Sequence, residues 1–261
     1  VVPLGAWRPG ACSFPAGSID GAAIRGVPER LTTLASWKGS TVIQTFEAGP
    51  WRTNCWIVSD GPGTECFIVD PGMDSADRIR ETVEGQRLKP IAVLLTHGHI
   101  DHMFSVLPVA DGYGIPALVH GSDRDRLGNP YGKMTADTRQ MVKALGVEFA
   151  EPADVVDLHH GFVETIAGFD ISVHHAPGHT EGSVLFETRH AGEPTIFSGD
   201  VLFAGSIGRT DLHGGDPDAM QRTLRNVVLP LPDDMIVHCG HGPSTTIGRE
   251  KATNPYLRTG I

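Results

Sequence analysis

Cysteine is scarce in this sequence, and the few cysteines present lie far apart. Cys12, Cys55, Cys66 and Cys239 form no Cys-x-x-Cys pair. A zinc ribbon or a disulfide framework requires cysteines at short or regular spacings. Both are therefore excluded, and we expect the thiols to be free and buried or half-buried.

Positive charge and long apolar runs are also lacking. The 21 Lys and Arg residues stand against 31 Asp and Glu residues, a formal net charge of −10, whereas a nucleic-acid-binding protein normally presents a basic surface. The apolar run at residues 91–95 is far too short to cross a bilayer. The first 15 residues lack the basic segment and apolar core of a signal peptide. We therefore expect a cytoplasmic protein without a nucleic-acid or membrane partner.

The length of 261 residues fits one large α/β domain. Residues 1–40 are rich in turn-forming residues and show no sustained period. We interpret them as an N-terminal extension to a domain that covers residues 41–261. The extension is expected to pack on this domain or on a second subunit, in which case it would contribute to a homo-oligomer.

From residue 41 onward, short apolar stretches alternate with amphipathic ones. The alternation predicts strands at residues 41–46, 55–59, 65–69, 90–95, 117–120, 162–166, 171–175, 183–187, 195–198 and 235–238. It predicts helices at residues 74–84, 103–113, 135–145 and 216–227. Strand clusters separated by helices in both halves indicate an α/β fold, a four-layer αββα sandwich of two packed sheets with helices outside.

A dense group of metal-binding residue types follows the apolar strand at 90–95. His97, His99, Asp101 and His102 stand within six residues. Imidazole and carboxylate groups together bind zinc, iron and similar metals. This spacing suits an irregular loop that aims two histidines into one cleft, and Gly98 lets that loop turn tightly.

Three further candidate ligands each follow a later predicted strand. They are His179 between Gly178 and Gly182, Asp200 directly after Gly199, and His241 between Gly240 and Gly242. Alone, each is a weak signal, because His and Asp are common in glycine-rich turns. Together, at the ends of successive strands, they predict one site built at one edge of the sheets.

This series of motifs resembles the metallo-β-lactamase superfamily. The longer segments 198–212 and 242–248 resemble its glyoxalase II-like branch, the hydroxyacylglutathione hydrolases and their shorter bacterial relatives. The resemblance extends from about residue 42 to residue 257. It implies the metallo-β-lactamase fold, with two divalent metal ions for which zinc is expected and iron or manganese are alternatives.

The resemblance also implies a role for each candidate. His97, His99 and His179 would hold one metal ion and Asp101, His102 and His241 the other, with Asp200 bridging the two. Asp70 resembles the family's aspartate that orients the ligands from behind. Asp101 and Asp200 would serve catalysis directly, by holding a metal-bridging hydroxide that acts as the nucleophile.

The implied substrate is a small acyl-thiol or ester, in particular an S-2-hydroxyacyl thiol. A thiolate leaves with a pKa of about 8.5 and needs no proton, which suits a site without an obvious general acid. Tyr131, Lys133 and Arg209 are candidate substrate contacts. The residues after 241 are too few for the helical domain that binds glutathione in the full-length enzymes, so the thiol stays open.

Four alternatives remain at this stage. A mononuclear iron persulfide dioxygenase would use His97, His179 and Asp200 as its triad. A lactonase or β-lactamase would use the same metals on another acyl group. A ribonuclease Z-like phosphodiesterase is disfavoured by the net acidity, and a non-enzymatic relative by the complete ligand set.

Overall fold

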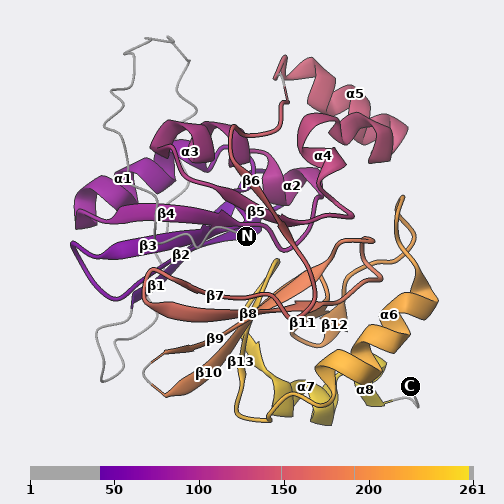
Figure 1. Cartoon of the computed structure of the whole chain (residues 1–261). Helices are drawn as coiled ribbons and strands as arrows, with labels where there is room; N and C mark the ends of the chain where they lie inside the picture. Colours follow the sequence, from indigo (N-terminus) through magenta and orange to yellow (C-terminus); the bar gives the residue numbers. More distant parts are fainter. Residues whose placement is uncertain (1–41, 148, 191, 259–261) are drawn as a thin grey trace, which may run out of the picture.

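The computed structural model describes residues 42–258 except residues 148 and 191. The predicted extension at residues 1–40 lies outside the described residues, so the domain boundary stays a prediction. Two six-stranded sheets pack face to face, and helices cover their outer faces (Figure 1). The predicted αββα sandwich is confirmed.

The first sheet holds its strands in sequence order. These are β1 (Val42–Ala48), β2 (Thr53–Ser59), β3 (Glu65–Val69), β4 (Lys89–Leu94), β5 (Ala117–His120) and β6 (Val155–Leu158). The first three are antiparallel, and β3 to β6 are parallel. Parallel neighbours need long crossover connections, which here contain α1 (Ala76–Gln86) and α3 (Val106–Tyr113).

The second sheet has the order β14-β13-β10-β9-β8-β7. Its strands are β7 (Val163–Ile166), β8 (Phe169–His175), β9 (Val184–His190), β10 (Glu193–Gly199), β13 (Ile236–Cys239) and β14 (Thr245–Thr246). A small hairpin of β11 (Leu202–Phe203) and β12 (Ser206–Ile207) follows β10. The helical segments on this side are α6 (Pro217–Thr223), η3 (Leu224–Val228), α7 (Ile247–Thr253) and α8 (Pro255–Arg258).

The core between the sheets is aromatic and aliphatic. The ring of Phe67 on β3 meets the rings of Phe169 and Phe197, with centroids 5.5 and 6.2 Å apart in edge-to-face geometry. All three side chains are buried, and such pairs stabilise beyond the area that they bury. Phe67 comes from the first sheet and the other two rings from the second, so the contact fixes the two sheets relative to each other.

The helix predicted at 103–113 differs from the structure, which has α2 (Ile100–Met103) followed by α3. The chain breaks the helix at Ser105, whose Oγ donates to the carbonyl of Gly72 and whose N–H donates to that of Pro71. The helix predicted at 135–145 is α5 (Ala136–Ala144), capped by the Thr135 hydroxyl, which accepts from the N–H of Thr138.

Several short elements had no clear sequence signal. They are β6, β11, β12, β14, α4 (Asp125–Gly128), η2 (Pro130–Lys133), α7 and α8. Over the described ranges, no helix has the length and apolar character needed to cross a membrane.

Candidate metal centre

The seven predicted ligands meet at one edge of the sandwich. His97 and His99 follow β4, and Asp101 and His102 lie in α2. His179 follows β8, Asp200 follows β10, and His241 follows β13. Four strands from two different sheets thus deliver side chains to one place, as expected where ligands follow the carboxyl ends of strands.

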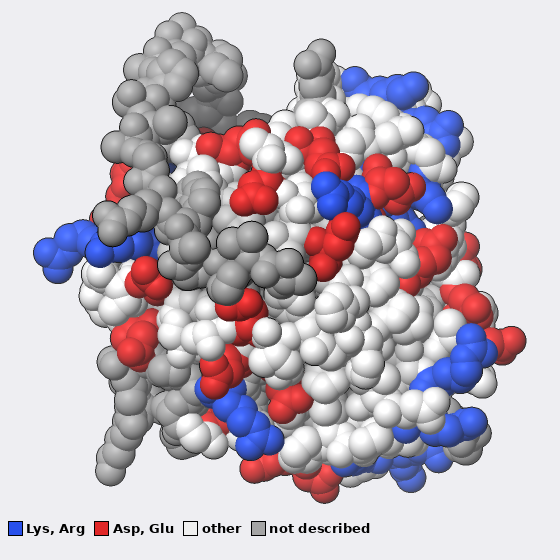
Figure 2. All heavy atoms as spheres, in the orientation of Figure 1, with Lys and Arg blue, Asp and Glu red and all other residues white. Residues whose placement is uncertain are grey.

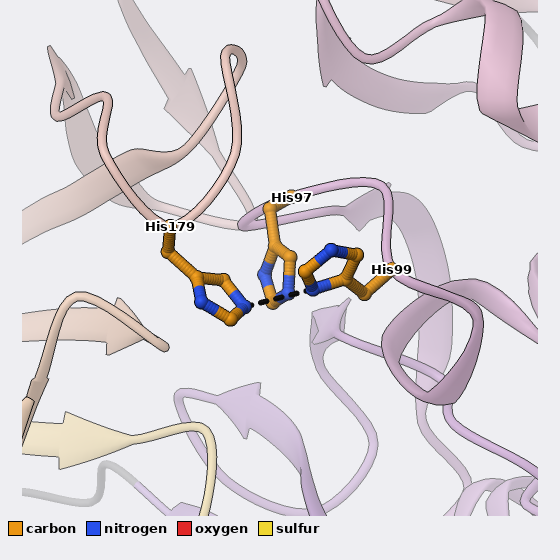
Figure 3. A group of neighbouring side chains, drawn as sticks. All are labelled: His97, His99 and His179. Carbon is orange, nitrogen blue, oxygen red and sulfur yellow. Dashed lines mark hydrogen bonds between the residues drawn. The ribbon is translucent and has the colours of Figure 1, made fainter. Parts of the chain in front are cut away.

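The first group consists of His97, His99 and His179, whose ligand nitrogens all lie within 4.8 Å of one another. Figure 3 shows the three rings converging, two from the loop after β4 and one from the loop after β8. The closest approach is 2.8 Å, between His99 Nδ1 and His179 Nε2.

The second group consists of Asp101, His102 and His241. His241 Nε2 lies 3.3 Å from Asp101 Oδ2 and 3.3 Å from His102 Nε2. Asp200 stands between the groups: its Oδ1 is 3.2 Å from His102 Nε2, and its Oδ2 is 3.4 Å from His179 Nε2. A carboxylate in this position can share its two oxygens between the groups.

Hydrogen bonds at the back of two histidines fix which nitrogen faces the cluster. His179 Nδ1 donates to the carbonyl of Arg209 over 2.7 Å. His102 Nδ1 donates to Asp70 Oδ2 over 2.9 Å. In His179 this leaves Nε2 as the lone-pair nitrogen, the arrangement in which a histidine binds a metal. For His102, burial disfavours the charged ring, but Asp200, Asp101 and Asp70 together raise its pKa well above the ordinary value, so a metal ion must first displace the proton on its Nε2.

Two buried ring nitrogens in the cluster lack a hydrogen-bond partner. They are His97 Nε2 and His99 Nε2. A buried polar atom without a partner is costly, and a bound cation would remove that cost. The residues therefore fit a dinuclear metal site, and imidazole with carboxylate suits zinc and iron alike.

The protonation states also favour ligation. Burial and the neighbouring His179 lower the pKa of His99 to about 3. Burial alone would raise the pKa of Asp101, but His102 and the hydrogen bond from His241 outweigh it and bring this pKa to about 2. At neutral pH these groups therefore have free lone pairs.

His241 behaves oppositely in the metal-free protein. Burial disfavours its charge, but hydrogen bonds to Asp101 and Asp200 raise its pKa to about 9. A metal ion must then displace a proton from this ring, so metal binding releases protons.

Buried residues outside the predicted set hold the ligands. Thr53 Oγ1 donates to Asp101 Oδ2 over 3.0 Å. Asn54 Nδ2 donates to the carbonyls of Cys239 and Gly242, which flank His241. Sequence reasoning missed both, although two polar residues at the start of an otherwise apolar strand were an available signal.

Five of the seven candidate ligands line an open cleft of about 550 Å³: His99, Asp101, His179, Asp200 and His241. Its apolar wall includes Trp51, Ile100 and Phe203, and Lys133 and Arg209 also line it. Both of these are predicted substrate contacts, although Arg209 is already paired with Asp211 through two 2.7 Å hydrogen bonds.

Tyr131, the third predicted contact, is not among the residues that line the cleft. Its ring packs edge-to-face against Phe149, with centroids 5.7 Å apart, and the Lys143 ammonium lies 5.5 Å from its centroid. Its hydroxyl donates to the carbonyl of Val147. The structure therefore gives Tyr131 a packing role in its loop.

Charge on the molecular surface is mixed. On the face shown in Figure 2, the described Lys and Arg side chains are interspersed with Asp and Glu rather than gathered into one broad basic area. The absence of a nucleic-acid partner stays a prediction.

Curated proteins with similar sequences match most of this chain. An uncharacterized protein of Mycobacterium tuberculosis is 41% identical over 220 residues, 83% of this chain and 97% of the relative. Hydroxyacylglutathione hydrolase GloC of Haemophilus influenzae is 32% identical over 219 residues, 83% of this chain and 98% of the relative.

Solved structures of similar proteins also match most of this chain. The structure titled BLEG-1 B3 metallo-beta-lactamase has a TM-score of 0.70 at 36% identity, covering 83% of this chain and 100% of that one. The structure titled TTHA1623 in a di-iron-bound form has a TM-score of 0.65 at 34% identity, covering 81% and 98%. The family model described as metallo-beta-lactamase superfamily matches residues 48–241, a range that contains all seven candidate ligands. On this match, together with the fold and the ligand clusters, the chain belongs to the metallo-beta-lactamase superfamily and is a probable metal-dependent hydrolase.

Proposed function

We propose that the chain hydrolyses a small thioester, in particular an S-2-hydroxyacyl thiol, with two metal ions. The observation that carries the proposal is the pair of three-residue ligand groups joined by Asp200. His97, His99 and His179 would hold one ion, Asp101, His102 and His241 the other. Bound there, the ions would supply an activated water as the nucleophile and polarise the acyl carbonyl.

The chain's own residues set the conditions for this chemistry. Burial would raise the pKa of Asp200, but His102 outweighs it and holds that pKa well below its usual range. Both Asp101 and Asp200 therefore stay ionised over the working pH range and line the cleft beside His99, His179 and His241. A thiolate leaving group needs no proton, so no further acid is required.

The cleft supports a small, partly apolar acyl thioester. The apolar side chains of Trp51, Ile100 and Phe203 can contact an acyl chain. Lys133 lines the same cleft and can place its positive charge near a polar part of the substrate. The Lys133 ammonium lies 3.5 Å from Glu181 Oε1, a looser pairing than the Arg209–Asp211 pair. The 32% identity to GloC supports the thioester assignment.

β-Lactam hydrolysis is the second candidate, and the observation that favours it is the 36% identity to the protein titled B3 metallo-beta-lactamase. Both reactions begin with attack on an acyl carbonyl. They differ in the leaving group: an amide nitrogen needs a proton, whereas a thiolate does not. A persulfide dioxygenase needs three ligands on one iron and leaves the group at Asp101 and His241 unexplained.

The test is a substrate screen of the metal-free protein reloaded separately with zinc and with iron. S-lactoylglutathione, the same acyl group on a smaller thiol, a lactone and a cephalosporin are compared, with elemental analysis of each sample. We expect two metals per chain and thiol release from the thioesters. Turnover of the cephalosporin alone would favour the second candidate. One iron per chain with oxygen consumption on glutathione persulfide would contradict the hydrolase.

A further inference from the structure

Asp123 is a buried carboxylate that contacts both loops of the three-histidine group. It lies between β5 and α4 and has no solvent exposure. One of these loops carries His97 and His99, and the other carries His179. Asp123 itself is not one of the seven candidate ligands.

The carboxylate accepts hydrogen bonds from both loops. Its Oδ2 accepts from the N–H of Gly98 over 2.8 Å and from the hydroxyl of Thr180 over 2.6 Å. Its Oδ1 accepts from the N–H of Gly182 over 3.2 Å. Gly98 separates His97 from His99, and Thr180 follows His179 directly, so both hydrogen bonds to Oδ2 act next to a ligand.

The chain makes room for this carboxylate. A Cβ at Gly182 would lie 2.6 Å from Asp123 Cγ, and one at Gly98 would lie 3.1 Å from Asp123 Cβ. Both distances are shorter than ordinary contact, so these two glycines permit the close approach of the loops to Asp123. The two glycines are an observation separate from the hydrogen bonds, and both observations indicate that the two loops pack closely on Asp123.

Arg126 balances the buried charge. Its side chain is 1% exposed, its Nε lies 3.1 Å from Asp123 Oδ1, and its Nη2 lies 2.7 Å from Glu181 Oε2. A buried carboxylate is tolerated when it is paired and hydrogen-bonded. Arg126 also lines the cleft that holds His99 and His179, whereas Asp123 lies behind it.

We propose that Asp123 is a positioning residue that sets the distance between the His97–His99 loop and the His179 loop, and thereby the metal affinity of the three-histidine group. The inference rests on the proposed metal centre and does not depend on the substrate. Residues that orient ligands from behind typically change metal affinity by about 10- to 100-fold.

The experiment isolates that group in an Asp101→Asn background, where the second group has lost a ligand. Zinc affinity is measured by competition with a chromophoric chelator, and unfolding of the metal-free proteins is followed by circular dichroism. Adding Asp123→Asn is expected to weaken zinc binding about 10- to 100-fold. The matched control is Asp125→Asn, an exposed aspartate two residues away, which is expected to leave the affinity unchanged.

Two substitutions at Thr180, which disturb the structure less, provide the test if the Asp123→Asn protein does not fold. Thr180→Val removes one donor to Asp123 at constant volume and should lower the zinc affinity, whereas Thr180→Ser keeps the hydroxyl and should restore it. Equal zinc affinity in the Thr180→Val protein, the Thr180→Ser protein and the protein that keeps Thr180 would overturn the inference and leave the proposed function standing. The same holds if the Asp101→Asn protein binds zinc equally well with and without Asp123→Asn. A parent chain that binds no metal overturns it together with the proposed function.

Discussion

His102 Nδ1 donates a hydrogen bond of 2.9 Å to Asp70 Oδ2, and neither side chain is more than 2% exposed. The same carboxylate accepts from the N–H and the hydroxyl of Thr96, the residue before His97. Asp70 therefore holds a candidate ligand of one metal group and the start of the loop that serves the other. It adopts a positive φ of 51°, a conformation that Asp tolerates better than most residues.

Replacing Asp70 with Asn should weaken metal binding. An amide has one accepting oxygen, and its NH₂ would face a donor from Thr96 or His102. We expect about 10- to 100-fold lower affinity for zinc and about 1–3 kcal/mol less stability of the metal-free protein. Chelator competition and urea unfolding measure the two effects. Asp74→Asn, at an exposed position, is the control. An unchanged zinc affinity in Asp70→Asn would contradict the role.

Replacing Asp101 with Ala should abolish hydrolysis and preserve the fold. The side chain is 17% exposed at the cleft and lies 3.3 Å from His241 Nε2, so its loss removes a ligand without opening the core. We expect a decrease in kcat/KM of at least ~100-fold and a metal content that falls from two to one per chain. Steady-state kinetics and elemental analysis provide the check. Retained turnover would refute the assignment.

Two glycine-to-alanine variants should have opposite effects. A Cβ at Gly240 would touch Asp200 Oδ1 and lie 2.7 Å from His102 Cε1, so Gly240→Ala should impair metal binding. Gly85 lies in α1 with nothing within 4 Å of a Cβ, so Gly85→Ala should stabilise the chain by about 0.5–1 kcal/mol through helix propensity. Metal titration and urea unfolding of both proteins test the pair. Normal metal content in Gly240→Ala would show that the site can adapt to the added methyl.

His238 should make the protein sensitive to acid. Its ring is 4% exposed and packs on Trp56, with centroids 4.4 Å apart. Burial lowers its pKa from 6.5 to about 4. Between these values the unfolded chain binds more protons than the folded chain, so stability is full above about pH 6.5 and decreases toward pH 4.

The contribution of His238 to this loss is about 3 kcal/mol. Urea unfolding of the metal-free parent and of His238→Gln, at pH 7 and at pH 4, isolates it because all other groups titrate alike in both. The parent should lose more stability than the variant over this interval. Equal losses would show that the ring is not held neutral by burial.

The fold could be predicted where local patterns decide the structure. The apolar run before His97 gave β4, and candidate ligands followed the predicted strands 171–175, 195–198 and 235–238, close to the ends of β8, β10 and β13. A strand end and a glycine-rich turn are both visible in sequence, so the seven candidates could be named. The two-residue strand β14 carries too little pattern to be recognised.

Long-range contacts explain what could not be predicted. The break at Ser105 depends on carbonyls of residues 71 and 72. Asn54 donates hydrogen bonds to the carbonyls of residues 239 and 242, and Asp123 accepts them from residues 98, 180 and 182. The sequence around these residues does not indicate which distant residues they contact. The ring of Tyr131 packs against Phe149, a contact that its loop sequence does not indicate, and its predicted contact with substrate stays a prediction.

The closeness of four candidate ligands in the chain has a thermodynamic consequence. His97, His99, Asp101 and His102 remain neighbours when the chain is denatured, so a metal ion can bind them there as well. Only the difference between the affinities of the two states stabilises the native one. The gain in melting temperature from added metal should therefore be smaller than the native affinity alone implies, and His179, Asp200 and His241, which join the cluster only on folding, supply that difference.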